Sequence, residues 1–145
     1  MDNKELRYDS NSEAVQAHLE IMQQVIQRMA SNSESSKAWC ITLVSAILVI
    51  VVDKGKPNYV WITIIPTVLF FILDSYYLSL EKGFRDSYNS FVSKIHAKKI
   101  EITDLFVVKP LGSPIKNFPK ATLSFSILPF YITLLLMIYI AKSII

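Results

Sequence analysis

Long uncharged apolar blocks alternate with polar segments along this chain. Three blocks carry no charged residue: residues 38–52, 59–73 and 121–141. A helix that spans a bilayer needs ~20 mainly apolar residues. The third block has 21 residues and meets this length, whereas the first two have 15 each and need their flanks. A soluble bundle with buried core helices is the alternative, but three such blocks leave too little polar surface to cover them. The pattern predicts transmembrane helices at residues 38–53, 59–77 and 121–141.

Turn residues separate the first two blocks. The sequence DKGKPN, residues 53–58, contains Gly and Pro, which indicate a tight connection between helices. Before the first block, apolar residues at helical spacing predict an amphipathic helix at about 12–30, with Ser10 and Glu13 as a capping box. After the second block, a similar stripe predicts that the helix continues to about residue 97. We therefore expect an all-α integral membrane protein whose first two spans form a long antiparallel hairpin that extends into the cytoplasm.

The position of the turn fixes which residues of the hairpin lie at equal depth. If its centre lies between Gly55 and Lys56, residues whose numbers add to 111 are level with one another. Lys37 then lies opposite Asp74. The two apolar stripes of the polar part also reach matching heights, so we expect them to pack together. The residues expected in this packing are His18, Met22, Tyr77, Phe84 and Tyr88.

The polar stretch before the first block, RMASNSESSKAW, has three possible meanings: a linker, a catalytic serine cluster, or a helix entering a membrane. The register favours the third, on one continuous or gently kinked helix. Arg28, Asn32, Ser36 and Trp39 follow one another at helical spacing and are the residues that we assign to the junction with the membrane.

Residues 98–120 differ from the helical segments on either side. Ile100 and Ile102 alternate with charged residues, and a Pro- and Gly-containing stretch follows. This pattern predicts a cytoplasmic loop with one or two short strands or an irregular packed segment, which returns the chain to the third span.

The distribution of basic residues sets the expected orientation. Residues 1–37 and 78–120 together carry twelve Lys and Arg, whereas the opposite side carries three. Because cytoplasmic loops are enriched in Lys and Arg, we expect the N-terminus and the long loop in the cytoplasm and the C-terminus outside. The basic cluster at residues 94–99 follows from this topology and lacks the interleaved aromatic residues of a nucleic-acid site, so no direct nucleic-acid partner is expected.

Composition and motifs give little indication of catalysis. The chain is 52% hydrophobic with one Cys, which rules out an internal disulfide framework. No GxSxG context, phosphate-binding loop or dinucleotide fingerprint is present, and one Cys with two distant His makes no metal set. We therefore expect neither an enzyme nor a cofactor.

Asp74 is the acidic residue of most interest because membrane-like sequence flanks it on both sides. A charge inside a bilayer is costly and should have a partner, which the register identifies as Lys37. The pair has two possible roles. It could lock the hairpin together, or it could act as a gating or coupling charge.

The run from His18 to Trp39 and the sequence LDSYYLSLEKGFRDSY after the second block resemble a family of small bacterial membrane proteins. The shared pattern is His-Leu-Glu, then Arg-Met-Ala-x-Asn-Ser and Lys-x-Trp, followed after the second span by Asp and Tyr-Tyr-Leu. The resemblance covers about residues 18–90, and residues 98–145 lie outside it.

Members of this family resemble components of anti-phage loci. The resemblance implies an inner-membrane effector that permeabilises or perturbs the membrane, works as a homo-oligomer, and is signalled through its cytoplasmic helices by a partner protein or a small nucleotide. The alternative of another class is a non-conducting membrane anchor or assembly subunit that docks a cytoplasmic partner.

Overall fold

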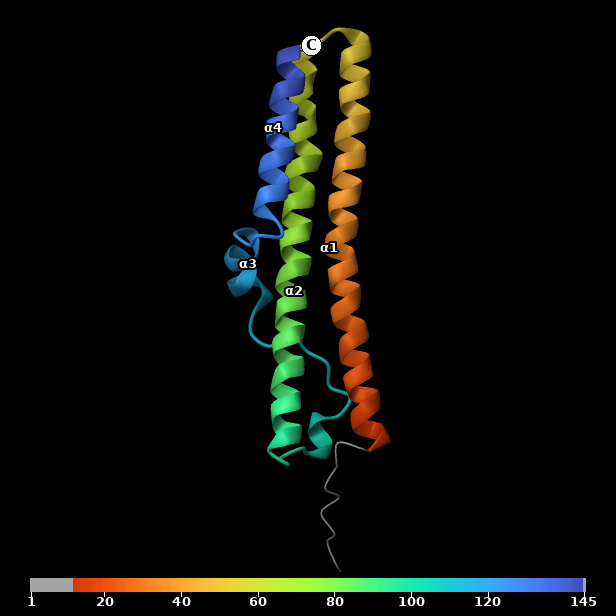
Figure 1. Cartoon of the computed structure of the whole chain (residues 1–145), viewed down its shortest axis with the longest axis vertical. Helices are drawn as coiled ribbons and strands as arrows, with labels where there is room; N and C mark the ends of the chain where they lie inside the picture. Colours follow the sequence, from red (N-terminus) through yellow and green to blue (C-terminus); the bar gives the residue numbers. More distant parts are fainter. Residues whose placement is uncertain (1–11, 145) are drawn as a thin grey trace, which may run out of the picture.

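The computed structural model describes residues 12–144, and these are helical almost throughout (Figure 1). The residues fold into four α-helices and two short 3₁₀ helices. In chain order the elements are α1 (Glu13–Lys54), η1 (Pro57–Thr63), α2 (Ile64–His96), η2 (Ile102–Asp104), α3 (Pro114–Thr122) and α4 (Leu128–Ile144).

The first helix is continuous, as the register predicted. α1 has 42 residues, about 60 Å of helix, and runs through the polar stretch at residues 28–39 without a break. Its N-cap is Ser12, whose hydroxyl accepts the Val15 N–H, whereas the predicted cap Ser10 lies outside the described residues. At the other end Gly55 adopts a left-handed conformation (φ 59°) that a side chain would disfavour.

α1 and α2 lie side by side and run in opposite directions (Figure 1). Two side-chain contacts define their register. Lys37 pairs with Asp74, and the Gln23 amide donates to the Tyr88 hydroxyl at 3.1 Å. Both pairs of residue numbers add to 111, the sum required by a hairpin centred between Gly55 and Lys56.

The segment predicted to contain short strands contains none within the described residues. Instead, η2 forms a single turn closed by a capping box between Glu101 and Asp104. The alternation of Ile100 and Ile102 was misleading because no neighbouring strand is available for pairing, so local turns satisfy the backbone groups. The rest of the segment is irregular and then forms α3.

The third apolar block does not form one helix over residues 121–141. α3 ends at Thr122, a turn follows, and α4 is a helix of 17 residues that begins at Leu128. Pro129 explains this start, because proline is favoured in the first helical turn, where its missing N–H would have no partner within the helix.

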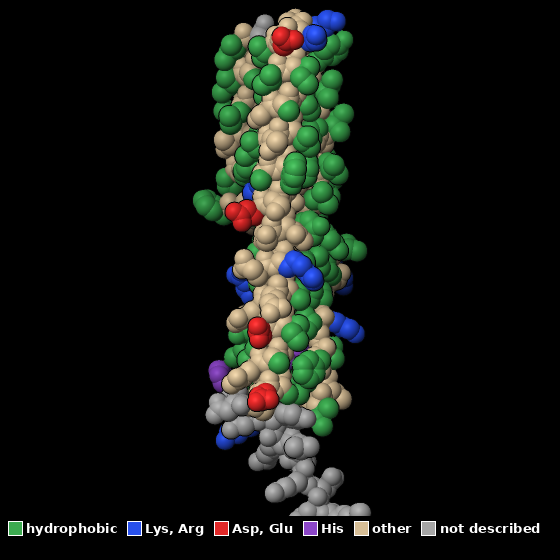
Figure 2. All heavy atoms as spheres, turned by 90° about the vertical axis from the view of Figure 1, so that its right-hand side faces the viewer, with side chains coloured by type: hydrophobic (Ala, Val, Ile, Leu, Met, Phe, Trp, Pro, Cys, Tyr) green, Lys and Arg blue, Asp and Glu red, His purple; other side chains and the backbone are tan. Residues whose placement is uncertain are grey.

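Two described helical stretches, Glu13–Lys54 and Pro57–His96, are long and apolar enough to cross a membrane, and α4 is apolar but shorter. Figure 2 shows hydrophobic side chains over the upper half of the α1 side, with charged side chains at the top end and in the lower half. Large apolar residues of α1 and α2, such as Val49 and Ile65, are about 70% exposed. This surface indicates membrane association.

The interior contains two separate hydrophobic clusters. One lies in the apolar half, by which we mean residues 37–74 of the hairpin together with α4. Here Cys40 and Val44 of α1 meet Tyr131, Leu134 and Ile138 of α4. The other lies in the polar half of the hairpin, which we call the stalk (residues 13–36 and 75–96). Val15, Met22 and Phe91 form its core together with Leu105, which comes from the segment after α2.

Candidate functional site

A layer of buried polar side chains separates the two hydrophobic clusters. Its members come from α1 and α2 and are at most 5% exposed: Ser33, Ser36, Asp74, Ser75 and Ser79. We call these residues, with Lys37, the polar layer. It lies where the stalk meets the apolar half, so it is the contact between α1 and α2 that joins the packing of the two halves.

The ion pair between Lys37 and Asp74 is the centre of the polar layer. The Lys37 Nζ lies 2.7 Å from Oδ2 and 2.9 Å from Oδ1 of Asp74. The Asp74 side chain is fully buried, whereas 18% of the Lys37 side chain stays exposed. A buried carboxylate is stable only when it is paired and hydrogen-bonded, and the long stem of Lys37 lets its amine reach Asp74 from the edge of the helix pair.

Ser33 completes the contact and was not predicted. Its hydroxyl donates to Asp74 and accepts from the Lys37 amine at 3.3 Å. Ser33 and Lys37 are four residues apart and therefore lie on one face of α1, so the spacing was a usable signal once Lys37 had been chosen.

Three further buried hydroxyls have no protein hydrogen-bond partner among the described residues. They belong to Ser75 in the polar layer, to Ser124 in the turn before α4 and to Tyr131 of α4. Tyr131 packs edge-to-face against Phe71 and Phe130, with ring centroids 5.2 Å and 4.9 Å away. Unpartnered buried hydroxyls destabilise the packing around them.

The residues predicted at the junction with the membrane do not share one buried face. Ser36 is buried and donates to the Asn32 carbonyl at 2.8 Å, but Arg28 is exposed and Trp39 is 61% exposed. The buried face of α1 consists instead of Met29, Ser33, Ser36 and Cys40. The face of α1 predicted from the spacing is therefore rotated by part of a turn from the face that is buried in the structure.

The residues predicted to pack in the stalk fall into two groups. His18 and Met22 are almost fully buried beside Phe91, and Tyr88 packs at the edge of that core. Tyr77 and Phe84 are half-buried and do not belong to either buried cluster.

The chain after α2 packs on the stalk as a third element. We call residues 99–113 the strap. Between η2 and α3 it crosses the open side of the α1–α2 pair (Figure 1). The Leu105 side chain inserts into the stalk core, and the Lys94 amine binds the Asp104 carboxylate at 2.6 Å. The strap therefore closes a core that the two helices alone leave open.

His18 holds the middle of the strap. Its Nδ1 accepts the backbone N–H of Phe106 at 3.0 Å, and Phe106 adopts an unfavourable left-handed conformation (φ 62°). Burial lowers the pKa of His18, although the nearby Asp104 carboxylate opposes this effect. Only a neutral imidazole has a ring nitrogen that can accept a hydrogen bond, so this contact requires deprotonated His18.

A close backbone contact holds the other end of the strap. The Leu111 N–H donates to the Gly83 carbonyl at 2.9 Å, and a Cβ on Gly83 would lie 2.9 Å from the Cβ of Pro110. Glycine in a helix is otherwise unfavourable, so the close approach of the strap explains its presence here.

We expect Gly83→Ala to loosen the strap without melting α2. The added methyl must push Pro110 away, whereas the helix itself gains up to ~1 kcal/mol of propensity. Hydrogen–deuterium exchange of the full-length protein should show faster exchange at residues 105–111 and unchanged exchange along α2. Asn89→Ala, on an exposed position of the same helix, is the matched control. Unchanged protection of the strap in Gly83→Ala would contradict the contact.

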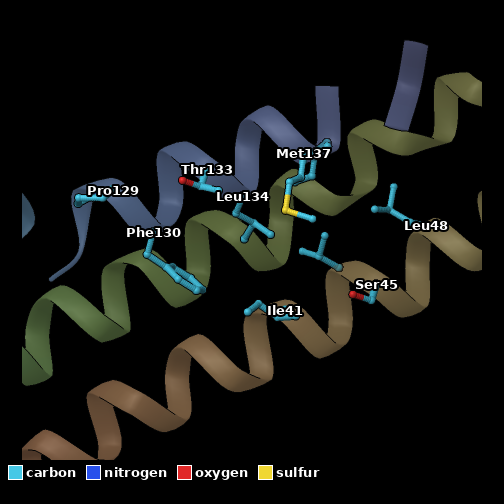
Figure 3. Close-up of a pocket in the computed structure, with 10 residues that line it drawn as sticks. Ile41, Ser45, Leu48, Pro129, Phe130, Thr133, Leu134 and Met137 are labelled. Atoms are coloured by element: carbon cyan, nitrogen blue, oxygen red, sulfur yellow. The ribbon is translucent and has the colours of Figure 1, made fainter. Parts of the chain in front are cut away.

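A groove of about 440 Å³ lies above the polar layer, between α1 and α4. Figure 3 shows Ile41, Ser45 and Leu48 of α1 on one side and Phe130 and Met137 of α4 on the other. Its lining is apolar apart from the hydroxyls of Ser45 and Thr133. α4 is thus held to the hairpin by a limited set of side chains, chiefly Tyr131, Leu134 and Ile138.

Within residues 12–144, no group of three or more His, Cys, Asp or Glu side chains is arranged to hold a metal ion. Comparison of the chain with known protein families, curated proteins and solved structures gives no match. The resemblance to small bacterial membrane proteins of anti-phage loci therefore stays a prediction based on sequence.

Proposed function

We propose that this protein is a multi-pass effector of the bacterial inner membrane that perturbs or permeabilises the membrane in anti-phage defence. Its spans are the upper part of α1, η1 with the upper part of α2, and α4. In this proposal the N-terminus, the stalk, the strap and α3 are cytoplasmic, and the C-terminus is outside. Copies of the chain assemble into a homo-oligomer when the stalk receives a signal from a partner protein or a small nucleotide.

The observation that carries the proposal is the polar layer on two unbroken helices. α1 and α2 continue from the stalk into the apolar half, and the buried Lys37–Asp74 pair lies at the boundary between the two halves. In this proposal a displacement of one helix in the stalk shifts the pair and thereby changes the packing of the apolar half. Coupling between distant sites requires an element that both sites can bias, and the pair is placed to be that element.

Side-chain chemistry at the turn end of the apolar half supports the spanning arrangement. At the end near the turn, the Lys142 amine lies 4.6 Å from the centre of the Trp61 ring, and Lys56 lies over Tyr59 at 5.5 Å. Lysines and aromatic residues of this kind are enriched at membrane interfaces. The 17 residues of α4 correspond to about 25 Å, somewhat less than the hydrocarbon thickness of about 30 Å, and snorkelling of its one lysine, Lys142, helps to accommodate the difference.

The proposal predicts that cells producing the protein with its neighbouring genes lose membrane potential during phage infection. The measurement is a potential-sensitive dye followed through infection. The Asp74→Asn variant should abolish the response, because it breaks the ion pair, and Asp53→Asn, which alters an exposed acidic residue near the turn, should keep it. Cells that stay polarised throughout infection with the unaltered protein would contradict the effector role.

The alternative proposal is a non-conducting anchor that docks a cytoplasmic partner protein. One observation favours it: Gln23, Gln24, Gln27, Arg28 and Ser31 form an extended polar surface with a shallow hollow on α1. Two results together would support the anchor. A soluble partner would bind stoichiometrically and be lost on Gln24→Ala/Arg28→Ala replacement, and the purified protein would show no conductance in liposomes. Conductance that survives this replacement would support the effector.

A further inference from the structure

α3 has three chemically distinct sides. Its buried side rests on α2 through Ala121, which is fully buried, and through the half-buried Phe118. The Pro114 carbonyl accepts the Ser79 hydroxyl at 2.7 Å and fixes the start of the helix. The helix therefore has a defined position against the hairpin.

A second side exposes large apolar side chains. Ile115 is 82% exposed, Leu123 just after the helix is 73% exposed, and Phe125 in the following turn is 93% exposed. Ile115, Pro119 and Leu123 are spaced four residues apart and therefore lie on one face. No described part of the chain covers these side chains.

The third side is cationic. Lys116 and Lys120 are exposed and lie one helical turn apart, next to the apolar face. Neither forms an ion pair with a described residue, although the chain has four ion pairs elsewhere in the described part. Their two positive charges are thus available to an anionic partner.

The depth of α3 along the hairpin is also defined. Ser79, which holds its first residue, lies about one helical turn on the stalk side of Asp74. Ala121, near its end, joins the cluster of the apolar half with Cys40 and Tyr131. α3 therefore lies where the polar and apolar halves meet, and Figure 1 shows it beside the middle of α2, below α4.

We propose that α3 is an interfacial anchor that lies at the headgroup level of the cytoplasmic leaflet and binds the phosphate groups of anionic phospholipids through Lys116 and Lys120. Ile115, Leu123 and Phe125 enter the boundary between headgroups and acyl chains. An apolar face edged by lysines is the composition by which interfacial helices bind such surfaces. This inference rests on the proposed membrane location and adds a lipid class and a binding surface to it.

The depth of the helix favours a bilayer over a protein as the occupant of this face. A protein partner that covered Phe125 would have to sit at the level where the apolar half begins, among exposed apolar side chains such as Leu69 and Ile72 of α2. A lipid leaflet covers all of these side chains at once and places its headgroups beside the lysines.

The test uses the full-length protein in vesicles with the single Cys40 replaced by alanine and one labelling cysteine introduced. A fluorophore at Phe125→Cys is exposed to spin-labelled phosphatidylglycerol or to spin-labelled phosphatidylcholine at equal mole fraction. We expect stronger quenching by the anionic lipid. In Lys116→Gln/Lys120→Gln the preference should weaken by roughly fivefold for each lysine lost and should also weaken with added salt.

Lys54→Gln/Lys56→Gln removes the same charge at the opposite end of the apolar half and should leave the preference unchanged. Equal quenching by both lipids in the unaltered chain would overturn the binding of anionic headgroups. Quenching by aqueous iodide as strong as that of a label at Ile102→Cys, an exposed strap position, would overturn the interfacial anchor and indicate solvent or a protein partner.

A label at Val49→Cys distinguishes failure of this inference from failure of the proposed function. Val49 is 69% exposed in the apolar half. If lipid quenches this label and iodide does not, while a label at residue 125 behaves as water-exposed, only the anchor fails. If iodide quenches both labels, the membrane location itself is wrong.

Discussion

Replacing Asp74 with alanine should lower the free energy of unfolding by about 3 kcal/mol, because it leaves the Lys37 amine without a partner at the edge of the buried layer. Lys37→Ala should be similarly costly, since it leaves a fully buried carboxylate uncompensated. The double variant should recover part of the loss, because neither charge then remains unpaired. Chemical unfolding of the purified protein in detergent measures all three values.

The exposed pair of Asp53 and Lys54 provides the control for this cycle. Both side chains are about 70% exposed, and the two charges lie 3.8 Å apart. Lys54→Ala should change stability by less than ~1 kcal/mol, as is usual for surface pairs. If the double variant at positions 37 and 74 is as unstable as the sum of the single changes, the pair has no mutual stabilising effect and the locking role is excluded.

Acidification should release the strap from the stalk. Burial lowers the pKa of His18 in the folded protein below the ordinary value of 6.5, so the unfolded chain binds this proton first. The contribution of neutral His18 is therefore complete above about pH 6.5 and is lost as the pH falls below it. Protonation also removes the acceptor for the Phe106 N–H. Hydrogen exchange, corrected for its intrinsic pH dependence, should show lost protection at residues 105–107 near pH 5.

Charged groups on both neighbouring elements affect the pH at which this transition occurs. Asp104 on the strap favours the protonated form of His18, whereas Lys94 on α2 binds Asp104 and lowers the pKa of that carboxyl. His18→Phe keeps the packing against Phe91 but removes the acceptor, so protection should be low at every pH. The exposed His96 is the matched control: His96→Ala should keep the full pH response. A strap that stays protected at pH 5 in the unaltered protein would exclude the His18 contact as a pH-sensitive latch.

The features that could be read from the sequence are those set by local rules. Helical periodicity and the DKGKPN turn predicted long helices and placed Lys37 opposite Asp74, because the depth of every residue in a hairpin follows from the position of its turn. The start of α4 at Leu128 was not predicted, although Pro129 is a signal for a helix start. The uncharged apolar sequence over residues 121–141 favoured one longer helix.

The features that could not be read depend on contacts distant in the chain. Leu105 inserts into a core formed by residues far from it in sequence, and the N–H of Phe106 meets His18 across 88 positions. In the sequence, Gly83 is only an unfavourable residue within a helix. Its role becomes clear from the structure, where Pro110 packs directly against it. The rotation of α1 about its axis was likewise set by its partner helix, which buries Ser33 and leaves Arg28 in water.

The strap also determines how far α4 can travel. While it is docked, α3 and α4 are held beside their own hairpin. Once it detaches, its 15 residues could extend to about 50 Å, which is several helix diameters. α3 and α4 could then slide together within the plane of the membrane and place Tyr131, Leu134 and Ile138 on the hairpin of a neighbouring copy. The length of this irregular segment thus sets how far the last helix can move from its own hairpin.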